Sequence, residues 1–457
     1  MKAAHTRFIM NEVSVGNGAG VYYQDGSTEF SACTFTLNKA QAVGGGIFTE
    51  KADVSVKNNC AFNGNTASQD SGGAIGIISG GLVAADSDFS QNTCGASGGA
   101  IINCDGACEI ENCTFNSNTA AMTGGAVFDN TSILTVKNCK FNANYAALGG
   151  VLGIGTGEIR IYNSELTGNS SGIAAGAVYA NYGNIYAEDS KFTGNKSYDT
   201  GGVFYSDRGS VGLVRCTVER NSANANGGVF AILFGSITLT ECDIESNESG
   251  MGGAVAYTLS KNVLTFADTN LKKNKAALDG GVVYGFAGTI KLSGCKIQDN
   301  TAENGNGGAF AARFASYDVE KCEFAGNRCG ALGSALHGNE MNIRDSSFSA
   351  NYAGEDGGAI YVTAGLELSN VKFDENRAEN GSVVFADTLG DVIGDKETRQ
   401  SLESNEKPAG NTEVLPEPEQ TPAIPVSIYI GGGVLVAAIL AAVLLIMCKR
   451  KKHKVAN

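Results

Sequence analysis

The chain has 457 residues, 62 of them glycine, and a net charge of −14. Five of the last ten residues are lysine or arginine and none is acidic, which leaves a net charge of −19 for the rest of the chain. Phosphate binding needs a basic stripe, and none is visible, so nucleic acid is excluded as an expected partner.

A motif recurs at a step of about 26 residues from residue 6 to about residue 394. Each copy holds a [Ser/Cys]-x-[Phe/aliphatic]-x-x-Asn hexamer, followed by a glycine-rich run that ends in aliphatic residues. The fifteen asparagines that close the hexamers are Asn11, Asn38, Asn65, Asn92, Asn118, Asn144, Asn169, Asn195, Asn221, Asn247, Asn274, Asn300, Asn327, Asn351 and Asn376. A period of this length, held over many copies, is typical of a solenoid.

Each repeat shows short runs of alternating polarity separated by turn residues, which predicts three short strands per repeat. In one repeat we expect them at residues 124–128, 133–136 and 139–141. The period favours a right-handed parallel β-helix over a six-residue left-handed coil. We therefore expect an all-β solenoid of about fifteen rungs over residues 1–394, with no proline to interrupt its ladders.

Two residue columns are expected to hold the solenoid together. The repeated asparagines should stack and hydrogen bond along the axis, and asparagine also tolerates the left-handed conformation of a bend. The phenylalanine of each hexamer, as in Phe35, Phe62, Phe115 and Phe324, should form a stacked core column.

The position after each glycine-rich run is apolar, and we assign it to the interior. It is Val21, Ile47, Ile75, Ile101, Val127, Leu152, Val178, Phe204, Phe230, Val255, Val283, Phe310, Leu336, Ile360 or Val384. The next residue should then point outward, and eight of these fifteen residues are aromatic: Tyr22, Phe48, Phe128, Tyr179, Tyr205, Tyr284, Tyr361 and Phe385. An exposed aromatic column is a candidate ligand face for a glycan or a protein, although strand faces also favour aromatic residues for purely structural reasons.

Eight cysteines form four pairs in adjacent repeats, with Cα atoms expected at ~4.8 Å, inside the disulfide range. The candidate bridges are Cys33–Cys60, Cys113–Cys139, Cys216–Cys242 and Cys295–Cys322, with Cys104–Cys108 as a fifth. Buried free thiols are the alternative. The chain has three histidines, so we expect no metal and no cofactor. His337 is expected to be an exposed residue without a role, and Asn130, in a predicted turn, is the best candidate for glycosylation.

The C-terminal region predicts a membrane anchor. Residues 395–425 contain all five prolines and are expected to be a linker. Residues 426–447 carry no charge, and as a helix they would span about 33 Å, enough for the ~30 Å core of a bilayer. The basic segment 448–457 should then be cytoplasmic by the positive-inside rule, with Cys448 as a palmitoylation candidate. Small residues at Gly433, Ala437 and Ala441 would allow homotypic association.

Two other topologies are open. The first repeat starts almost at the first residue, so we expect the chain to lack its own N-terminal segment and signal peptide. A tail-anchored protein facing the cytosol needs no signal peptide but contradicts the charge rule. A cell-wall sorting signal is disfavoured, because Leu415-Pro416-Glu417-Pro418-Glu419 lacks the Thr-Gly pair that such signals contain.

The two motifs together resemble those of the chlamydial polymorphic membrane proteins and their counterparts in unicellular eukaryotes. The first is seen at Gly72-Gly73-Ala74-Ile75 and the second at Phe62-Asn63-Gly64-Asn65. The resemblance implies surface-displayed right-handed parallel β-helices that mediate adhesion. Chlamydial members end in an outer-membrane translocator domain, whereas this chain ends in an apolar span and a basic tail, as in protist surface proteins.

We therefore expect a single-pass plasma-membrane protein with an extracellular adhesive solenoid. Its expected ligands are proteins or glycans on other cells, and no catalysis is expected. A β-helical polysaccharide lyase or hydrolase is the main alternative, but its paired carboxylates and irregular rungs are absent from the sequence. A passive surface coat is the other alternative.

Overall fold

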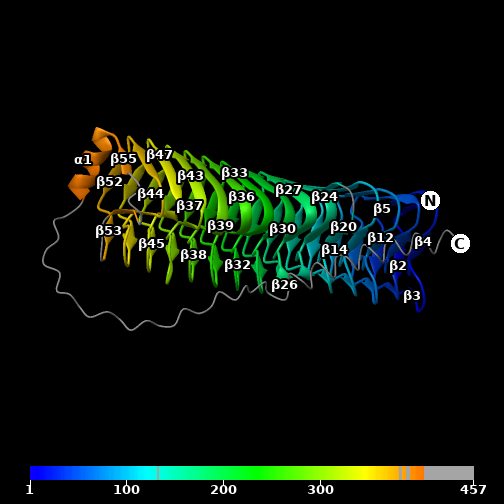
Figure 1. Ribbon diagram of the computed structural model, residues 1–457. Coiled ribbons are helices and arrows are strands. Elements are labelled where there is room, and N and C mark those ends of the chain that lie inside the picture. Colours follow the sequence, from blue (N-terminus) through cyan, green and yellow to red (C-terminus); the bar gives the residue numbers. More distant parts are fainter. Residues whose placement is uncertain (131–132, 380–382, 387–391, 406–457) are drawn as a thin grey trace, which may run out of the picture.

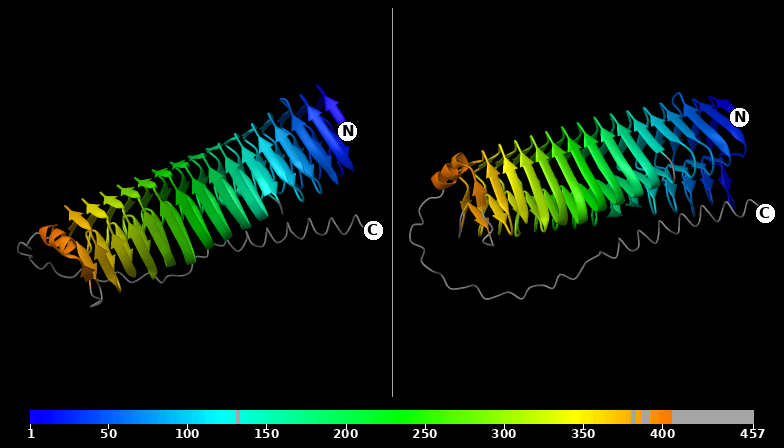
Figure 2. Two further views of the ribbon diagram at one scale, coloured as in Figure 1. Left: turned by 90° about the horizontal axis from the view of Figure 1, so that it is seen from above. Right: turned by 45° about the horizontal axis from the view of Figure 1, so that its top comes forward.

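The computed structural model describes residues 1–130, 133–379, 383–386 and 392–405. These residues form one long parallel β-coil of fifteen turns, closed at its C-terminal end by helix α1 (Lys396–Asn405) (Figure 1). Views from two further directions show a straight, slightly twisted rod (Figure 2). The predicted all-β coil is confirmed. The anchor at 426–447 and the tail at 448–457 lie outside the described residues. No helix within the described ranges has the length and apolarity needed to cross a membrane.

Three sheets run along the rod, each formed by pairing every strand in parallel with its counterpart one turn later. Sheet A has 25 strands. Six middle strands are long and continuous: β24 (Leu152–Tyr162), β27 (Val178–Glu188), β30 (Phe204–Val214), β33 (Phe230–Thr240), β36 (Ala256–Ala267) and β39 (Val283–Ser293).

Elsewhere in sheet A each turn contributes two short strands. The first of each turn are β4 (Val21–Tyr23), β8 (Ile47–Thr49), β12 (Ile75–Ile77), β16 (Ile101–Asn103), β20 (Val127–Asp129), β42 (Phe310–Ala312), β46 (Leu336–Gly338), β50 (Ile360–Val362) and β54 (Val384–Ala386). The second are β1 (Lys2–Ala4), β5 (Gly26–Ser31), β9 (Ala52–Lys57), β13 (Leu82–Ala85), β17 (Cys108–Glu111), β21 (Ile133–Lys137), β43 (Ala315–Glu320), β47 (Glu340–Arg344), β51 (Leu366–Ser369) and β55 (Val392–Gly394).

Sheet B carries the hexamer phenylalanines at the centre of its strands. These are β2 (Arg7–Ile9), β6 (Thr34–Thr36), β10 (Ala61–Asn63), β14 (Asp88–Ser90), β18 (Thr114–Asn116), β22 (Lys140–Asn142), β25 (Glu165–Thr167), β28 (Lys191–Thr193), β31 (Thr217–Glu219), β34 (Asp243–Glu245), β37 (Asn270–Lys272), β40 (Lys296–Gln298), β44 (Glu323–Ala325), β48 (Ser347–Ser349) and β52 (Lys372–Asp374).

Sheet C was not predicted, because its strands are short and follow the repeated asparagine directly. They are β3 (Glu12–Val13), β7 (Lys39–Ala40), β11 (Thr66–Ala67), β15 (Thr93–Cys94), β19 (Thr119–Ala120), β23 (Tyr145–Leu148), β26 (Ser170–Ala174), β29 (Lys196–Ser197), β32 (Ser222–Ala223), β35 (Glu248–Ser249), β38 (Lys275–Ala276), β41 (Thr301–Ala302), β45 (Arg328–Cys329), β49 (Tyr352–Ala353) and β53 (Arg377–Ala378).

The predicted asparagine ladder is confirmed along the whole coil. Each side-chain amide donates to the carbonyl oxygen of the next asparagine; Asn169 Nδ2, for example, lies 2.9 Å from Asn195 Oδ1. The left-handed bend, however, belongs to the preceding residue rather than to the asparagine. Ala143 before Asn144 has φ 53° and Arg220 before Asn221 has φ 54°. Asparagine recurs in every turn of the ladder because its side chain forms these hydrogen bonds, and not because the backbone there needs a left-handed residue.

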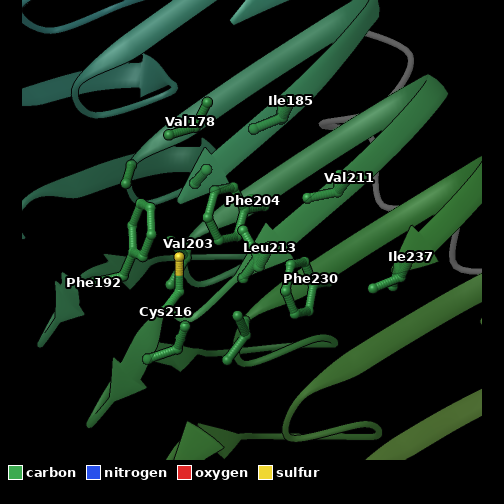
Figure 3. Close-up of a cluster of buried hydrophobic side chains, with 14 of the residues drawn as sticks. Val178, Ile185, Phe192, Val203, Phe204, Val211, Leu213, Cys216, Phe230 and Ile237 are labelled. Atoms are coloured by element: carbon green, nitrogen blue, oxygen red, sulfur yellow. The ribbon is translucent and has the colours of Figure 1, made fainter. Parts of the chain in front are cut away.

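Apolar side chains of sheets A and B fill the main core, and small residues of sheet C form separate clusters, such as Ala67, Cys94, Ala120 and Ala146. Phe35, Phe62 and Phe89 stack with ring centroids 4.7 and 4.8 Å apart, which confirms the predicted column. Further along the rod, Phe204 and Phe230 of sheet A stack at 5.1 Å and Phe192 of sheet B meets Phe204 edge-on, so neighbouring turns share one core (Figure 3).

The first eleven residues of the predicted linker 395–425 belong instead to the fold. Asp395 accepts a hydrogen bond from Thr398 N at 2.8 Å, which caps the start of α1. Thr398 and Ser401 then accept from Val371 N and Phe373 N at 3.0 and 2.8 Å, which satisfies backbone donors of the last turn. Leu402 packs against the core. Helix α1 is therefore a polar cap over the open end of the coil.

Candidate functional site

The prediction that the aromatic column is an exposed ligand face is wrong. The eight residues do lie in one register column of sheet A, yet only Tyr22 is exposed, at 51%. Phe48, Phe128, Tyr179, Tyr205 and Tyr361 are buried, and Tyr284 and Phe385 are half-buried. Their side chains point away from the main core and form a second apolar layer, with Tyr179 and Tyr205 stacked at 5.4 Å.

The glycine-rich loop that precedes each strand covers this layer. Gly44 has φ +70°, and a Cβ atom there would lie 3.0 Å from Cβ of Phe48. Gly149 has φ +59°, and its Cβ would lie 2.8 Å from that of Tyr179. Only glycine allows the loop to fold back so closely. The outward direction was predicted, but the loop that closes over the rings was not.

One repeat is shifted by a residue. Phe230 pairs with Ala256 rather than with Val255, because Gly253, not Gly252, takes the left-handed position of the loop at φ +65°. Tyr257 consequently joins the aromatic column, where it pairs with Tyr284. Val255 is buried in the core as predicted, although Ala256 occupies the register position in this turn.

His337 lies in the same column, and the prediction that it is exposed is wrong. It is 8% exposed and stacks on Tyr361 with ring centroids 5.1 Å apart. Its Nδ1 is buried and has no hydrogen-bond partner among the described residues. Burial lowers the pKa of His337 to about 4, with the Arg313 charge acting in the same direction and Asp279 opposing it.

Replacing His337 with phenylalanine should remove a loss of folded stability that His337 causes at acidic pH. The unfolded chain binds the His337 proton below its ordinary pKa of 6.5, whereas the folded chain does so only near 4, so folded stability falls as pH drops through this interval. The gain in free energy of unfolding over the native chain should be about 2 kcal/mol larger at pH 5 than at pH 7.5. It is measured by chemical denaturation of both proteins at both pH values. An exposed control, His5→Gln, should show no such difference; an equal gain at both pH values would contradict the assignment.

None of the predicted disulfides is formed. The eight paired cysteines are buried free thiols. Each sulfur donates to a backbone carbonyl nearby, as Cys113 Sγ does to Glu111 O at 3.2 Å. Cys108 is also a free thiol, so the Cys104–Cys108 bridge is absent. Burial raises the pKa of Cys216 to about 12, which makes its thiol poorly reactive.

The predicted glycosylation site does not fit the surface. Asn130 is only 6% exposed, and its backbone carbonyl accepts a hydrogen bond from Thr156 N, so a glycan there is not accommodated. Among the chain's Asn-x-Thr/Ser motifs, Asn112 is exposed instead, at the turn before β18. Cys448 lies outside the described residues.

An apolar ridge on sheet A, which the sequence did not predict, is the most distinctive part of the surface. We define the ridge as one residue from each of six consecutive turns: Tyr182, Arg208, Phe234, Leu259, Phe286 and Phe314. They lie on neighbouring strands β27, β30, β33, β36 and β39 and just after β42, along the middle of the rod (Figure 1). At ~4.8 Å per turn the ridge is about 24 Å long.

The ridge is open to solvent. Phe314 is 73% exposed, Phe234 51%, Tyr182 48% and Leu259 41%. Large apolar side chains in one contiguous row on a soluble surface are typical of a binding site.

Arg208 is held between two rings of the ridge. Its guanidinium carbon lies 5.5 Å from the ring centroid of Tyr182 and 5.6 Å from that of Phe234. Neither Arg208 nor Arg313, which precedes Phe314, forms an ion pair with a described carboxylate. Burial raises the pKa of the neighbouring Asp207, and the Arg208 charge partly opposes this. The two rings thus hold the Arg208 guanidinium in place.

A strip without side chains runs beside the ridge. Gly157, Gly183, Gly209 and Gly235 occupy the same register position on β24, β27, β30 and β33. A Cβ atom at Gly209 would lie 2.1 Å from the carbonyl oxygen of Gly183, so no other residue fits there. The space that a side chain would need at these positions is filled by the backbone of the neighbouring turn.

Comparison with known families agrees with this architecture. The family model described as a right handed beta helix region matches residues 1–148 and 98–271, together more than half of the chain. The chain therefore belongs to the right-handed β-helix family. The Chlamydia polymorphic membrane protein repeat matches residues 345–363, which contain Phe348–Asn351 and Gly357–Ile360. No curated protein and no solved structure matches the chain.

Proposed function

We propose that the coil is the binding part of a membrane-anchored surface protein, an adhesin that engages proteins or glycans on other cells without catalysis. The exposed ridge carries this proposal, because a row of large apolar side chains in solvent is costly unless a partner covers it. The match to a polymorphic membrane protein repeat supports a surface location. The apolar segment 426–447 and the basic tail support a single span with the coil outside the plasma membrane.

The ridge also favours an adhesin over a passive coat. A coat needs no unpaired guanidinium clamped between rings and no apolar row on one face. Side-by-side association of several anchored copies would strengthen weak contacts along such rods.

A polysaccharide lyase or hydrolase is the second candidate. A hollow of about 520 Å³ near the N-terminal end of sheet A is lined in part by Glu29, Asp53 and Glu109. Two of these carboxylates already have partners: Glu29 contacts Lys57 at 3.2 Å, and Asp53 accepts from Gly81 N at 2.7 Å. The Lys57 hydrogen bond lowers the pKa of Glu29, which is the opposite of what a general acid needs.

The adhesin role predicts saturable binding to cells. Beads carrying the full-length chain, attached through its C-terminal tail, should adhere to at least one cell type in a panel of host and neighbouring cells. Adhesion should exceed that of beads carrying an unrelated protein of equal negative charge, and soluble chain should compete for it. Adhesion no greater than the acidic control across the panel would favour the coat role.

A further inference from the structure

The ridge places arginine side chains beside a row of large apolar side chains. The chain outside its basic tail has a net charge of −19, yet this patch presents Arg208 and Arg313 without ion-pair partners among the described residues. The apolar side chains of Phe234, Leu259 and Phe314 continue the row. A ligand that fits must therefore supply negative charge beside large apolar groups.

Arg208 has the geometry of a carboxylate receptor. Two rings at 5.5 and 5.6 Å hold its planar guanidinium in one orientation, which reduces the conformational entropy lost when a ligand binds. A guanidinium offers parallel N–H donors that match the two oxygens of a carboxylate. By contrast, Arg220 on another face already donates to Glu219.

The neighbouring apolar groups favour a protein over a sugar as the source of that carboxylate. Sugars bind the open faces of aromatic rings, but the faces of Tyr182 and Phe234 that meet Arg208 are covered by its guanidinium. Leu259 is aliphatic, and such a side chain suits the leucine, isoleucine or phenylalanine of a protein.

We propose that the ridge binds an extended, acidic and apolar segment of a partner protein, with a carboxylate on Arg208 and large apolar side chains along Phe234, Leu259 and Phe314. This inference rests on the proposed binding role of the coil and specifies its partner. Because one contact is an ion pair, binding should weaken as salt is raised.

The test uses the full-length chain in detergent and three fluorescent peptides of equal length, in which leucine alternates with glutamate, glutamine or lysine. We expect the Glu/Leu peptide to bind best by fluorescence anisotropy, and the Gln/Leu peptide to bind at least about tenfold more weakly. Arg208→Gln should weaken Glu/Leu binding by about tenfold or more, whereas the matched variant Arg220→Gln should leave it unchanged. Arg208→Lys keeps the positive charge but loses the paired N–H donors of the guanidinium, so it should give an intermediate affinity. It provides a second test in case the glutamine variant misfolds.

Several outcomes would overturn the proposal. Equal affinity for the Glu/Leu and Gln/Leu peptides would show that the ligand carboxylate does not contribute to binding. Unchanged affinity in Arg208→Gln would show that the peptide does not bind at the ridge. Binding of hyaluronan that depends on Arg208, without peptide binding, would make the ligand an acidic glycan. Self-association in sedimentation that Arg208→Gln abolishes would make it a second copy of the chain. If beads still adhere to cells while Arg208→Gln has no effect, the adhesin role stands and only this inference fails.

Discussion

Replacing Asn195 with alanine should open the coil locally at a cost of about 4 kcal/mol, one of the largest effects expected of any single substitution in this protein. Asn195 Oδ1 accepts from both the backbone N and the side-chain Nδ2 of Asn169, at 3.1 and 2.9 Å. Its own Nδ2 donates to Leu166 O at 2.8 Å. Asn195 Nδ2 also donates to Asn221 Oδ1 at 3.1 Å, so the variant removes four buried hydrogen bonds. Water does not reach the groups left behind, because Asn195 is fully buried.

Amide hydrogen exchange measures this effect where it occurs, because the turns of a solenoid open with their neighbours rather than all at once. Exchange should accelerate in the turns around Asn169, Asn195 and Asn221 and stay slow near both ends. The matched control is Asn142→Ala: Asn142 donates to Asn116 at 3.0 Å on the outer face, where water replaces the lost bond. Equal acceleration in the two variants would show that the ladder contributes little.

Replacing Phe115 with alanine should cost about 3–5 kcal/mol through the cavity it leaves. Phe115 is fully buried and stacks between Phe89 and Phe141, with centroids 4.6 and 4.8 Å away. Neighbouring turns are fixed by continuous ladders on three sheets, so the backbone has little freedom to collapse into the space.

The expected readout is a lower midpoint in chemical denaturation. Phe115→Leu, which resembles Leu166 further along the same column, should lose less than half as much. A midpoint unchanged by Phe115→Ala would mean that the stacked column is not a major source of stability.

The coil was predictable because its determinants repeat. The ladder asparagine recurs in every turn, and a phenylalanine or an aliphatic residue recurs at the centre of every sheet B strand. Each position that repeats in the sequence therefore forms a column along the coil. The second apolar layer was missed for a physical reason: whether Phe48 or Tyr179 is exposed depends on a glycine loop that folds back through a left-handed residue. The conformation of this loop is set by φ angles and close packing rather than by the polarity of its residues.

The ridge was not predictable from the repeat, because it occupies a position that has no common residue type. Tyr182 aligns with Thr156 on one side, and Arg208 aligns with Phe234 on the other. Only the long strands of the middle turns bring these side chains into one row. Helix α1 was missed because its contacts with the last turn are mainly polar, through Thr398 and Ser401, with Leu402 as the apolar contact.

The most direct test of the account is whether cell adhesion depends on the ridge. Beads carrying the full-length chain with Leu259→Ser and Phe314→Ser should lose most of their adhesion, because both exposed apolar contacts are removed. Beads carrying Tyr198→Ser, which removes a ring that is 56% exposed on another face, should adhere like the native chain. Full adhesion of the ridge variant, or equal loss in both variants, would contradict the claim that this face of the coil is the binding site.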